Sequence, residues 1–297
     1  MARTVEQPGV YDGMPNDAYH CDPVPGGSLS SSGARMLLPP SCPALFRYWA
    51  DEGQPPKREY DFGHAAHLKV LGEGEELVVV DAKDWRTNAA KAAKAAAHEA
   101  GKVPILAAEN ERAEEMAAAV FKHPTAGALF KPGTGKPEQS LFWVDEQTGI
   151  WRRARLDWLR NPGPGRLIVA DYKTAASAEP DALARSMLNF GYYQQADWYQ
   201  TAVKVLGLDL RGDAAFVLVA QEKTPPYLIT ICEPDADALQ WGRRLNRKAI
   251  DVYRRCKETD RWPGYSDEVV YLSLPGYAGY QLEAAAQRGD YDLEPTQ

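Results

Sequence analysis

One predicted hairpin constrains this chain most, because two strand-like stretches flank a sequence that can only turn. Residues 151–160 and 166–173 each have the composition of a strand, and Pro and Gly fill most of residues 161–165 between them. In an antiparallel hairpin about this turn, paired residues have a constant number sum, so Asp157 pairs with Asp171. Their Cβ atoms are therefore expected roughly 4.5–5.5 Å apart.

The hairpin gathers two carboxylates and one amine, which is the chemistry of a hydrolytic metal site. Strand alternation places Lys173 on the same face as Asp171 and points Tyr172 away. Two carboxylates can hold one or two Mg²⁺ ions, which polarise a phosphodiester and lower the pKa of a bound water. A neighbouring lysine can orient or deprotonate that water. The alternative is a surface hairpin with an Asp–Lys salt bridge, and the second carboxylate across the pair counts against it.

Two further residues are candidates for the same site. Glu138 lies just before a strand predicted at 139–144, where it suits a metal ligand or a group that holds the metal-bound water. It could equally be a solvated loop acid. His67 follows His64 by one helical turn, but no third strong zinc ligand stands nearby, so we discount a zinc pair. A lone helical histidine is more often structural.

Tyr192, Gln195 and Tyr199 fall along one stripe of a predicted helix. Aromatic packing against a sheet would explain the two tyrosines. The glutamine between them indicates a polar role, such as binding a phosphate or supporting the surroundings of the lysine.

The composition is that of a globular protein, with 44% hydrophobic and 25% charged residues in a chain of 297. No apolar run approaches the roughly 18–20 residues that span a bilayer, and the first residues lack the apolar stretch of a signal peptide. We therefore expect a cytoplasmic location and no membrane partner. Four scattered cysteines without a CxxC pair count against a zinc ribbon, a disulfide framework and an iron–sulfur cluster.

The net charge of −7 lowers the expectation of a nucleic-acid binder, which usually has a basic footprint. The local distribution differs from the sum, because arginines crowd the hairpin and a late helix is rich in Arg and Lys. The plainer interpretation of that helix is a solvated face. These cations are Arg152, Arg153, Arg155, Arg160 and Arg166 at the hairpin, and Arg243, Arg244, Arg247, Lys248, Arg254, Arg255 and Lys257 on the helix.

The chain is expected to form one α/β (α+β) domain at residues 28–265, with its catalytic core at about 138–232. An extended arm at 1–27 precedes the domain and an extension at 266–297 follows it. Within residues 28–38, several possible N-caps precede a short helix that Pro39 and Pro40 end. Periodicity and breakers predict further helices at 43–52, 60–71, 88–100, 109–121, 180–206 and 235–259, with an interruption conceivable near Gly191. Strands are predicted at 77–80, 139–144, 150–159, 166–173, 214–220 and 227–232.

The order of these residues resembles that of PD-(D/E)XK nucleases. More closely, the chain looks like the nuclease domain of RecE-type exodeoxyribonuclease (exodeoxyribonuclease VIII) and its phage relatives, over roughly residues 10–265. The motifs are His67, Glu138, Asp157, Asp171-Tyr-Lys173-Thr and Tyr192-x-x-Gln195-x-x-x-Tyr199, together with Tyr19-His20, residues 28–35, Phe62-Gly63-x-x-x-His67 and residues 222–227. The second acid is Asp171 rather than Glu, as in the RecE-type variant.

The resemblance implies a central mixed sheet flanked by helices, with N-terminal helical additions, and a Mg²⁺ site in which Mn²⁺ can substitute. Asp157 and Asp171 would bind the ion, with the Tyr172 carbonyl as a further ligand. His67 would complete the metal site, and Lys173 would position or activate the water.

The same resemblance implies supporting roles for other residues. Glu138 would assist the metal site, and Gln195 would support the active site or the DNA backbone. As further DNA-binding or support candidates we name Tyr192, Tyr199, Arg153 and Arg155, the two arginines as the lining of a channel, and Arg35 for a 5′-phosphate.

The activity implied is a processive 5′→3′ exonuclease on double-stranded DNA ends, built as a homo-oligomeric ring. Its partner would be a single-strand annealing protein in phage-type recombination. Three alternatives stay open: a PD-(D/E)XK endonuclease, a helicase-associated nuclease of the same fold, and a non-catalytic DNA-binding scaffold. The Asp/Asp/Lys set counts against the scaffold, because a cluster of like charges without a function would only cost stability.

Overall fold

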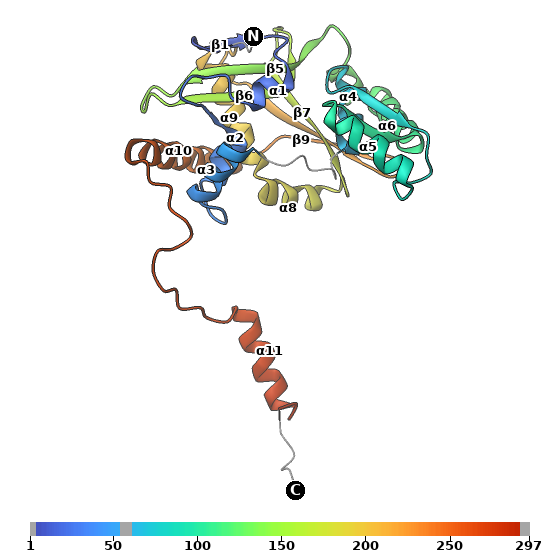
Figure 1. The fold of residues 1–297 in the computed structure, drawn as a ribbon. Coiled ribbons are helices and arrows are strands. Elements are labelled where there is room, and N and C mark those ends of the chain that lie inside the picture. The colour runs from blue at the N-terminus through green and yellow to red at the C-terminus, as the bar shows by residue number, and fades with distance from the viewer. Residues whose placement is uncertain (1–3, 54–60, 292–297) are drawn as a thin grey trace. The chain divides into compact units, whose positions relative to one another are not determined.

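A mixed β-sheet lies at the centre of the computed structural model, which describes residues 4–53 and 61–291 (Figure 1). Within these residues the sheet has seven strands, in the order β1-β5-β6-β7-β8-β9 with β2 paired to β6. The strands are β1 (Gly9–Tyr11), β2 (Leu29–Ser30), β5 (Gly135–Val144), β6 (Trp151–Arg160), β7 (Ile168–Ala175), β8 (Ala215–Glu222) and β9 (Ile229–Cys232). The pairs β7–β8 and β2–β6 are parallel and the others are antiparallel, which confirms the predicted mixed sheet.

Strand β6 is shared between two neighbours along one edge. It pairs with β7 only at Trp158 and Leu159, whereas β2 pairs with it at Arg152 and Arg153. Asp157 therefore lies at the fork where β7 leaves β6.

The fork modifies the predicted hairpin without changing its register. Trp158 pairs with Ala170, so the next pair in the series is Asp157 and Asp171, as the sequence predicted. The ladder ends one residue before that pair, because the strands have already separated.

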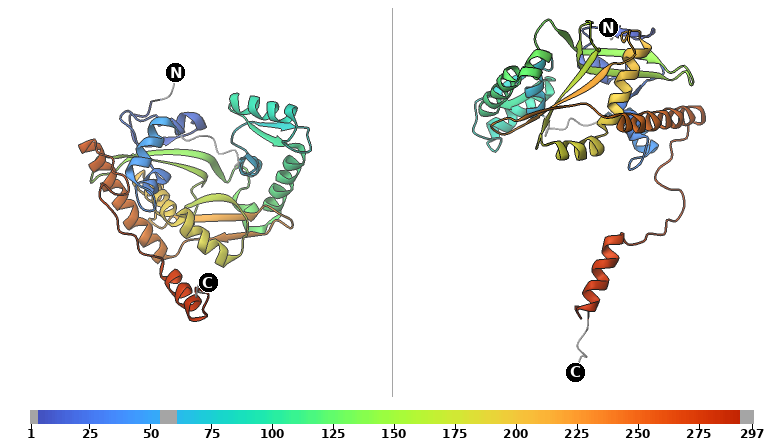
Figure 2. Two further views of the ribbon diagram at one scale, coloured as in Figure 1. Left: turned by 60° about the horizontal axis from the view of Figure 1, so that its bottom comes forward. Right: turned by 180° about the vertical axis from the view of Figure 1, so that it is seen from behind.

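Helices cover both faces of the sheet, and Figures 1 and 2 show the two groups on opposite sides. Alternation along β8 divides the core: Phe216 and Leu218 face one cluster, whereas Val217 and Val219 face the other. The first cluster includes α2 (Ser31–Met36), α9 (Tyr192–Val205) and α10 (Ala236–Thr259), and the second includes α4 (Asp61–Leu71), α6 (Ala107–Lys122) and α7 (Pro124–Leu129).

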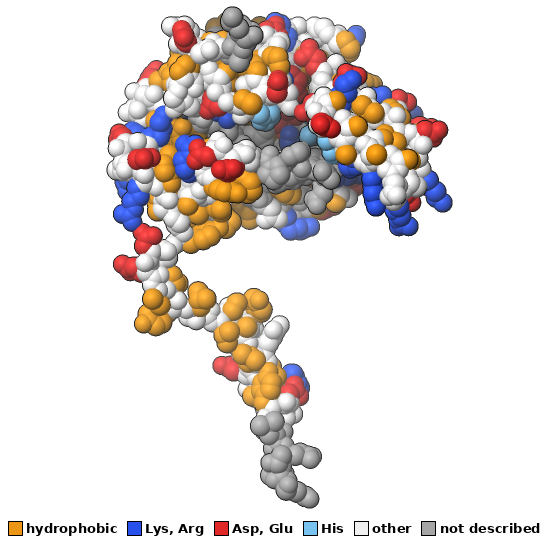
Figure 3. Space-filling view, viewed as in Figure 1, with side chains coloured by type: hydrophobic (Ala, Val, Ile, Leu, Met, Phe, Trp, Pro, Cys, Tyr) orange, Lys and Arg blue, Asp and Glu red, His pale blue; other side chains and the backbone are white. Residues whose placement is uncertain are grey.

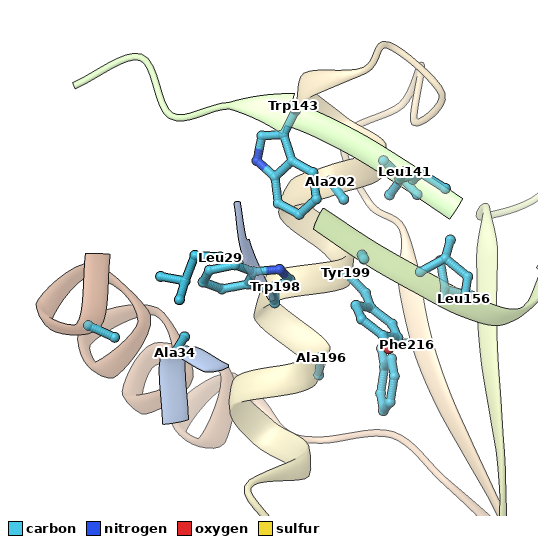
Figure 4. Close-up of a cluster of buried hydrophobic side chains, with 14 of the residues drawn as sticks. Leu29, Ala34, Leu141, Trp143, Leu156, Ala196, Trp198, Tyr199, Ala202 and Phe216 are labelled. Atoms are coloured by element: carbon cyan, nitrogen blue, oxygen red, sulfur yellow. The ribbon is translucent and has the colours of Figure 1, made fainter. Parts of the chain in front are cut away.

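The core beneath α9 is built from large aromatic side chains and small helix residues (Figure 4). Trp198 of α9 meets Trp143 of β5 edge to face, with ring centroids 5.9 Å apart. Ala196 and Ala202 let the helix approach the sheet closely, and all four of these residues are fully buried. This packing fixes the helix that carries Gln195.

Most predicted helices are confirmed, in places to the residue. Helix α3 spans Pro43–Glu52, α5 spans Asn88–Glu99 behind the Thr87 N-cap, and α10 begins after the Asp235 N-cap. The predicted helix start at Tyr60 lies outside the described residues. Strand β3 (Leu77–Val80) matches its prediction, but its parallel partner β4 (Val103–Leu106) was not predicted, because four residues that include Pro104 make a weak strand signal.

The helical region at 180–206 is two helices. Helix α8 (Pro180–Phe190) ends at its C-cap, Gly191, which has a left-handed φ of 70°. Gly191 is also the N-cap of α9. The interruption considered near Gly191 is confirmed.

The N-terminal segment is not the extended arm that we expected. It contributes β1 at the sheet edge and helix α1 (Asn16–His20), and it buries Val5, Met14, Tyr19 and Val24 against Phe142. These apolar residues stand singly among Pro, Gly and Asp, so no periodicity marked them.

The chain divides into two compact units, one ending at Trp262 and the other starting at Pro263. The second unit contains α11 (Gly276–Gln287), which was not predicted. Among the described residues, no helix combines the length and the apolar character needed to cross a bilayer.

The close approach of α10 to α9 depends on Gly242. A Cβ atom at this position would lie 2.3 Å from the Tyr193 carbonyl oxygen, so Gly242→Ala should destabilise the fold by about 1–3 kcal/mol. Urea unfolding measures the difference. Gly63→Ala is the matched control, because its Cβ would meet only the Thr174 hydroxyl at 3.7 Å. Equal free energies of unfolding for the two variants would contradict this account of the helix contact.

Candidate active site

Five elements of the first unit bring the predicted polar residues together around the β6–β7 fork. They are α4 with His67, β5 with Glu138, β6 with Asp157, β7 with Asp171 and Lys173, and α9 with Gln195.

Asp157 is the centre of the group because three nitrogen atoms lie within hydrogen-bond or ion-pair distance of its carboxylate. Its Oδ2 lies 3.0 Å from the backbone nitrogen of Tyr172, 3.1 Å from His67 Nε2 and 3.5 Å from Lys173 Nζ. The bond to Tyr172 replaces the ladder bond that is lost where β7 leaves β6. A backbone N–H in this partly buried position needs such an acceptor.

His67, Glu138 and Asp157 form a group that could hold a metal ion. One ligand atom from each lies within 4.8 Å of the others, and all three side chains are partly buried. Glu138 was expected just before the first core strand, but it lies inside β5 with a left-handed φ of 50°. Pairing with β6 is regular on both sides of it, so in register it stands opposite Asp157.

Asp171 stands beside this group and is not part of it. The carboxylate is fully buried, its Oδ2 lies 2.7 Å from Lys173 Nζ, and its Oδ1 accepts from Gln195 Nε2 at 2.9 Å. Within the described residues Oδ2 has no hydrogen bond beyond this ion pair, so it keeps lone pairs for a cation. Direct ligation by Asp171 and by the Tyr172 carbonyl stays a prediction.

The charges of the site are set by burial and by one another. Burial raises the pKa of Asp157, but Lys173 and His67 outweigh it and hold that pKa below its usual range. Burial and the charge of Asp157 raise the pKa of Asp171 to about 6. Burial lowers the pKa of Lys173, but the two carboxylates raise it further, to above its usual value. At neutral pH Lys173 is therefore a cation, suited to orienting a water or a phosphate oxygen.

The pKa of His67 is raised for a similar reason. Burial alone would lower it, but the charges of Asp157 and Glu138 outweigh burial. Arg155 pairs with Oε2 of Glu138, which leaves Oε1 facing His67 Nδ1 at 3.5 Å.

The aromatic stripe of α9 serves mainly in packing. Tyr199 is buried and packs edge to face on Phe216, with ring centroids 5.9 Å apart. Tyr192 stacks on Phe190 at 5.7 Å. Gln195 therefore has the polar role that the stripe indicated, and the contribution of the two tyrosines to DNA binding stays a prediction.

The hairpin arginines hold the N-terminal segment to the sheet. Arg153 donates to the Ser28 carbonyl at 2.9 Å and to its hydroxyl at 2.8 Å, and it forms an ion pair with Asp22. Arg155 donates to the Met14 carbonyl at 2.9 Å. Their side chains are only 13% and 14% exposed, but both residues also line the cavity at the site, and their role in lining a DNA channel stays a prediction.

A cavity of about 1310 Å³ opens onto the site and is larger than a typical small-molecule pocket. Asp157, Glu138 and Gln195 line it, as do the cations Arg35 and Lys257. Figure 3 shows a hollow on this face with histidine side chains at its edge. Arg35, predicted to contact a 5′-phosphate, is exposed on α2 and donates to the Phe190 carbonyl.

Sequence reasoning missed one buried residue that supports the site, through its hydrogen bond with Tyr172. Gln221 of β8 is fully buried, accepts from the Tyr172 hydroxyl at 2.5 Å and donates to the Met116 carbonyl at 2.9 Å. Gln221 lies one residue beyond the strand predicted at 214–220, and a lone glutamine there has no motif of its own. Its only signal was a polar residue at the end of an apolar run.

The mixed sheet and the Asp, Asp and Lys side chains gathered at it are typical of a PD-(D/E)XK domain, and the family comparison agrees. Residues 46–275 match the PDDEXK-like domain of unknown function (DUF3799), and the chain belongs to this family.

Solved structures support the fold. The crystal structure of a protein from Eubacterium rectale named "Putative exonuclease" aligns over 84% of this chain and 91% of its own, with a TM-score of 0.54 at 16% identity. The crystal structure of SSO0001 aligns over 66% of this chain and 84% of its own, but its TM-score of 0.30 at 15% identity carries no argument. No curated protein matches the sequence.

His67 is expected to contribute directly to metal binding. His67→Ala should weaken Mn²⁺ binding about ten-fold or more, because it removes one of three clustered donors. Isothermal titration calorimetry measures the dissociation constant. His64→Ala, on the same helix but paired with Glu75 at 3.4 Å, should bind like the unaltered protein. Unchanged affinity in His67→Ala would remove this residue from the metal site.

Gln195 is expected to position Asp171. Gln195→Leu should lower the kcat of DNA hydrolysis about 10–100-fold, the usual effect of losing a group that orients a ligand. The acid limb of the pH profile should move to higher pH, because a lost hydrogen bond disfavours the ionised carboxylate and raises its pKa. The matched control is Gln200→Leu, since Gln200 donates to the Ala214 carbonyl at 2.9 Å on the same helix. If both variants lose activity equally with unshifted profiles, Gln195 has only a packing role.

Proposed function

We propose that this chain is a metal-dependent exodeoxyribonuclease that hydrolyses phosphodiester bonds from the ends of double-stranded DNA. One observation carries the proposal: three carboxylates, an imidazole and a lysine converge at a strand fork that borders a cavity, in a chain of the PDDEXK-like family. The convergence is costly without a cation, since it gathers carboxylates in a partly buried position.

The donor set fits a divalent cation. His67, Glu138 and Asp157 would hold it, and Asp171 offers a buried Oδ2 beside them. Carboxylate oxygens suit Mg²⁺ and Mn²⁺, and we propose Mg²⁺ as the working ion with Mn²⁺ as a substitute. When bound, such an ion polarises the scissile phosphate and lowers the pKa of a coordinated water.

The protein side chains would orient the reacting groups. Lys173, held between Asp157 and Asp171, reaches the site as a cation and would stabilise charge on the attacked phosphate or orient the attacking water. Gln195 fixes Asp171 from the α9 side. Arg35 and Lys257 line the cavity, and as cations they would contact the phosphate backbone.

The finer features of the proposal rest on the RecE-type motifs rather than on the geometry. They are 5′→3′ polarity, processivity, a ring-shaped homo-oligomer, a single-strand annealing partner, a role in phage-type recombination and a location in the host cytoplasm. The order of the motifs from His67 to Tyr199 supports them.

Degradation of a linear duplex labelled at one 5′ end tests the proposal. The protein should degrade the duplex with Mg²⁺ and not with EDTA, and early release of the label would indicate 5′→3′ polarity. Lys173→Ala should lower the rate about 10²–10⁴-fold, the usual contribution of a positioned acid–base group. Because Lys173 also offsets the charge of the buried Asp171, the thermal midpoint should fall, and the assay is run at a temperature where Lys173→Ala is shown to be folded.

Lys69→Ala is the matched control, because Lys69 pairs with Glu114 at 2.9 Å outside the site. A covalently closed duplex separates the nuclease types, since an exonuclease cannot start on it. Cleavage of the closed circle would favour an endonuclease. Binding without degradation in Mg²⁺ or Mn²⁺ would favour a non-catalytic scaffold.

A further inference from the structure

An exposed aromatic side chain stands on the wall of the active-site cavity. Phe190 lines the same cavity as Asp157 and Gln195, and 57% of it is exposed. Tyr192 stacks on its ring at 5.7 Å with an interplanar angle of 28°, so the two rings form one platform.

The backbone beneath this ring is tied to the catalytic residues. Gly191 has a φ of 70°, and both Gln194 and Gln195 donate backbone hydrogen bonds to its carbonyl, at 3.0 and 3.1 Å. Arg35 donates to the Phe190 carbonyl from the other side. The left-handed φ of Gly191 favours glycine, and a Cβ here would also lie 2.7 Å from Arg35 Cδ, so that Arg35 would have to shift. Phe190 is thereby fixed relative to Gln195 and, through Gln195, to Asp171.

Single exposed apolar residues are common, and Leu188 on the same helix is 69% exposed. Phe190 differs from Leu188 because it is aromatic, it lines the cavity, and cations stand with it on the cavity wall. Aromatic rings interleaved with cations are the features that bind a single nucleic-acid strand, since each base stacks and each phosphate pairs.

We propose that Phe190 is a stacking site for one nucleobase of the strand whose phosphodiester lies at the cleavage site. The proposal rests on the proposed nuclease function and adds a determinant of substrate position.

Two substrates separate stacking from general damage to the site. Phe190→Ala should raise the KM for a linear duplex about ten-fold, within the range expected for a lost base–aromatic contact. The kcat for bis(p-nitrophenyl) phosphate, a phosphodiester without a nucleobase, should be unchanged; only its KM could respond, because its own rings can stack on Phe190. Phe190→Trp should retain duplex cleavage, and Leu188→Ala is the matched control.

A single abasic nucleotide, moved stepwise from the duplex end, identifies the stacked base. The unaltered protein should be slowed by the abasic nucleotide at one position, and Phe190→Ala should show no further slowing there, because the lost base and the lost ring share one interaction. Additive slowing at every position would overturn the proposal. An equal loss of kcat for bis(p-nitrophenyl) phosphate in Phe190→Ala would also overturn it.

Binding of a single-stranded oligonucleotide in EDTA keeps the two proposals distinguishable. If the unaltered protein cleaves no phosphodiester, the proposed function fails, and fluorescence anisotropy still tests the stacking site. About ten-fold weaker binding by Phe190→Ala would support it, and equal binding by Phe190→Ala and Leu188→Ala would overturn it.

Discussion

The site depends on one hydrogen bond, from the Tyr172 backbone N–H to the Asp157 carboxylate at 3.0 Å. Where β7 leaves β6, the ladder loses its acceptor, and a buried N–H without a partner is costly. The side chain of Asp157 supplies the acceptor and is thereby drawn into the fork. The same carboxylate then meets His67 and Lys173, so the strand separation and the assembly of the polar group are one structural event.

Paired cations lower the free-energy cost of burying the carboxylates of this site. Lys173 lies between the carboxylates of Asp157 and Asp171, and Arg155 pairs with Glu138. Each cation offsets part of the cost of burying a carboxylate. The balance also gives the two aspartates different pKa values: Lys173 and His67 hold that of Asp157 below its usual range, whereas burial and its neighbour's charge raise the pKa of Asp171 to about 6. A bound cation would therefore be favoured, because it would stabilise the ionised carboxylates of the cluster.

Long helices and the hairpin register were predictable because their signals are local. Helix α3 follows from a Pro at its start and a Gly after its end, and the pairing of β6 with β7 follows from one Pro/Gly turn. The N-terminal segment was not predictable in the same way. Its buried residues have no period, and its contacts with Arg153 and Arg155 depend on partners more than a hundred residues away.

The sequence by itself determined the chemistry of the site: which carboxylates, lysine, histidine and glutamine are available, and which of them share a strand face. Alternation and turn geometry are properties of a few consecutive residues, so they can be read directly. Only the tertiary structure decided that Glu138 enters β5 with a left-handed backbone, that Asp171 stands beside the three-residue group, and that Phe190 reaches the cavity wall. These outcomes depend on packing between distant segments, where burial and charge pairing outweigh local preference.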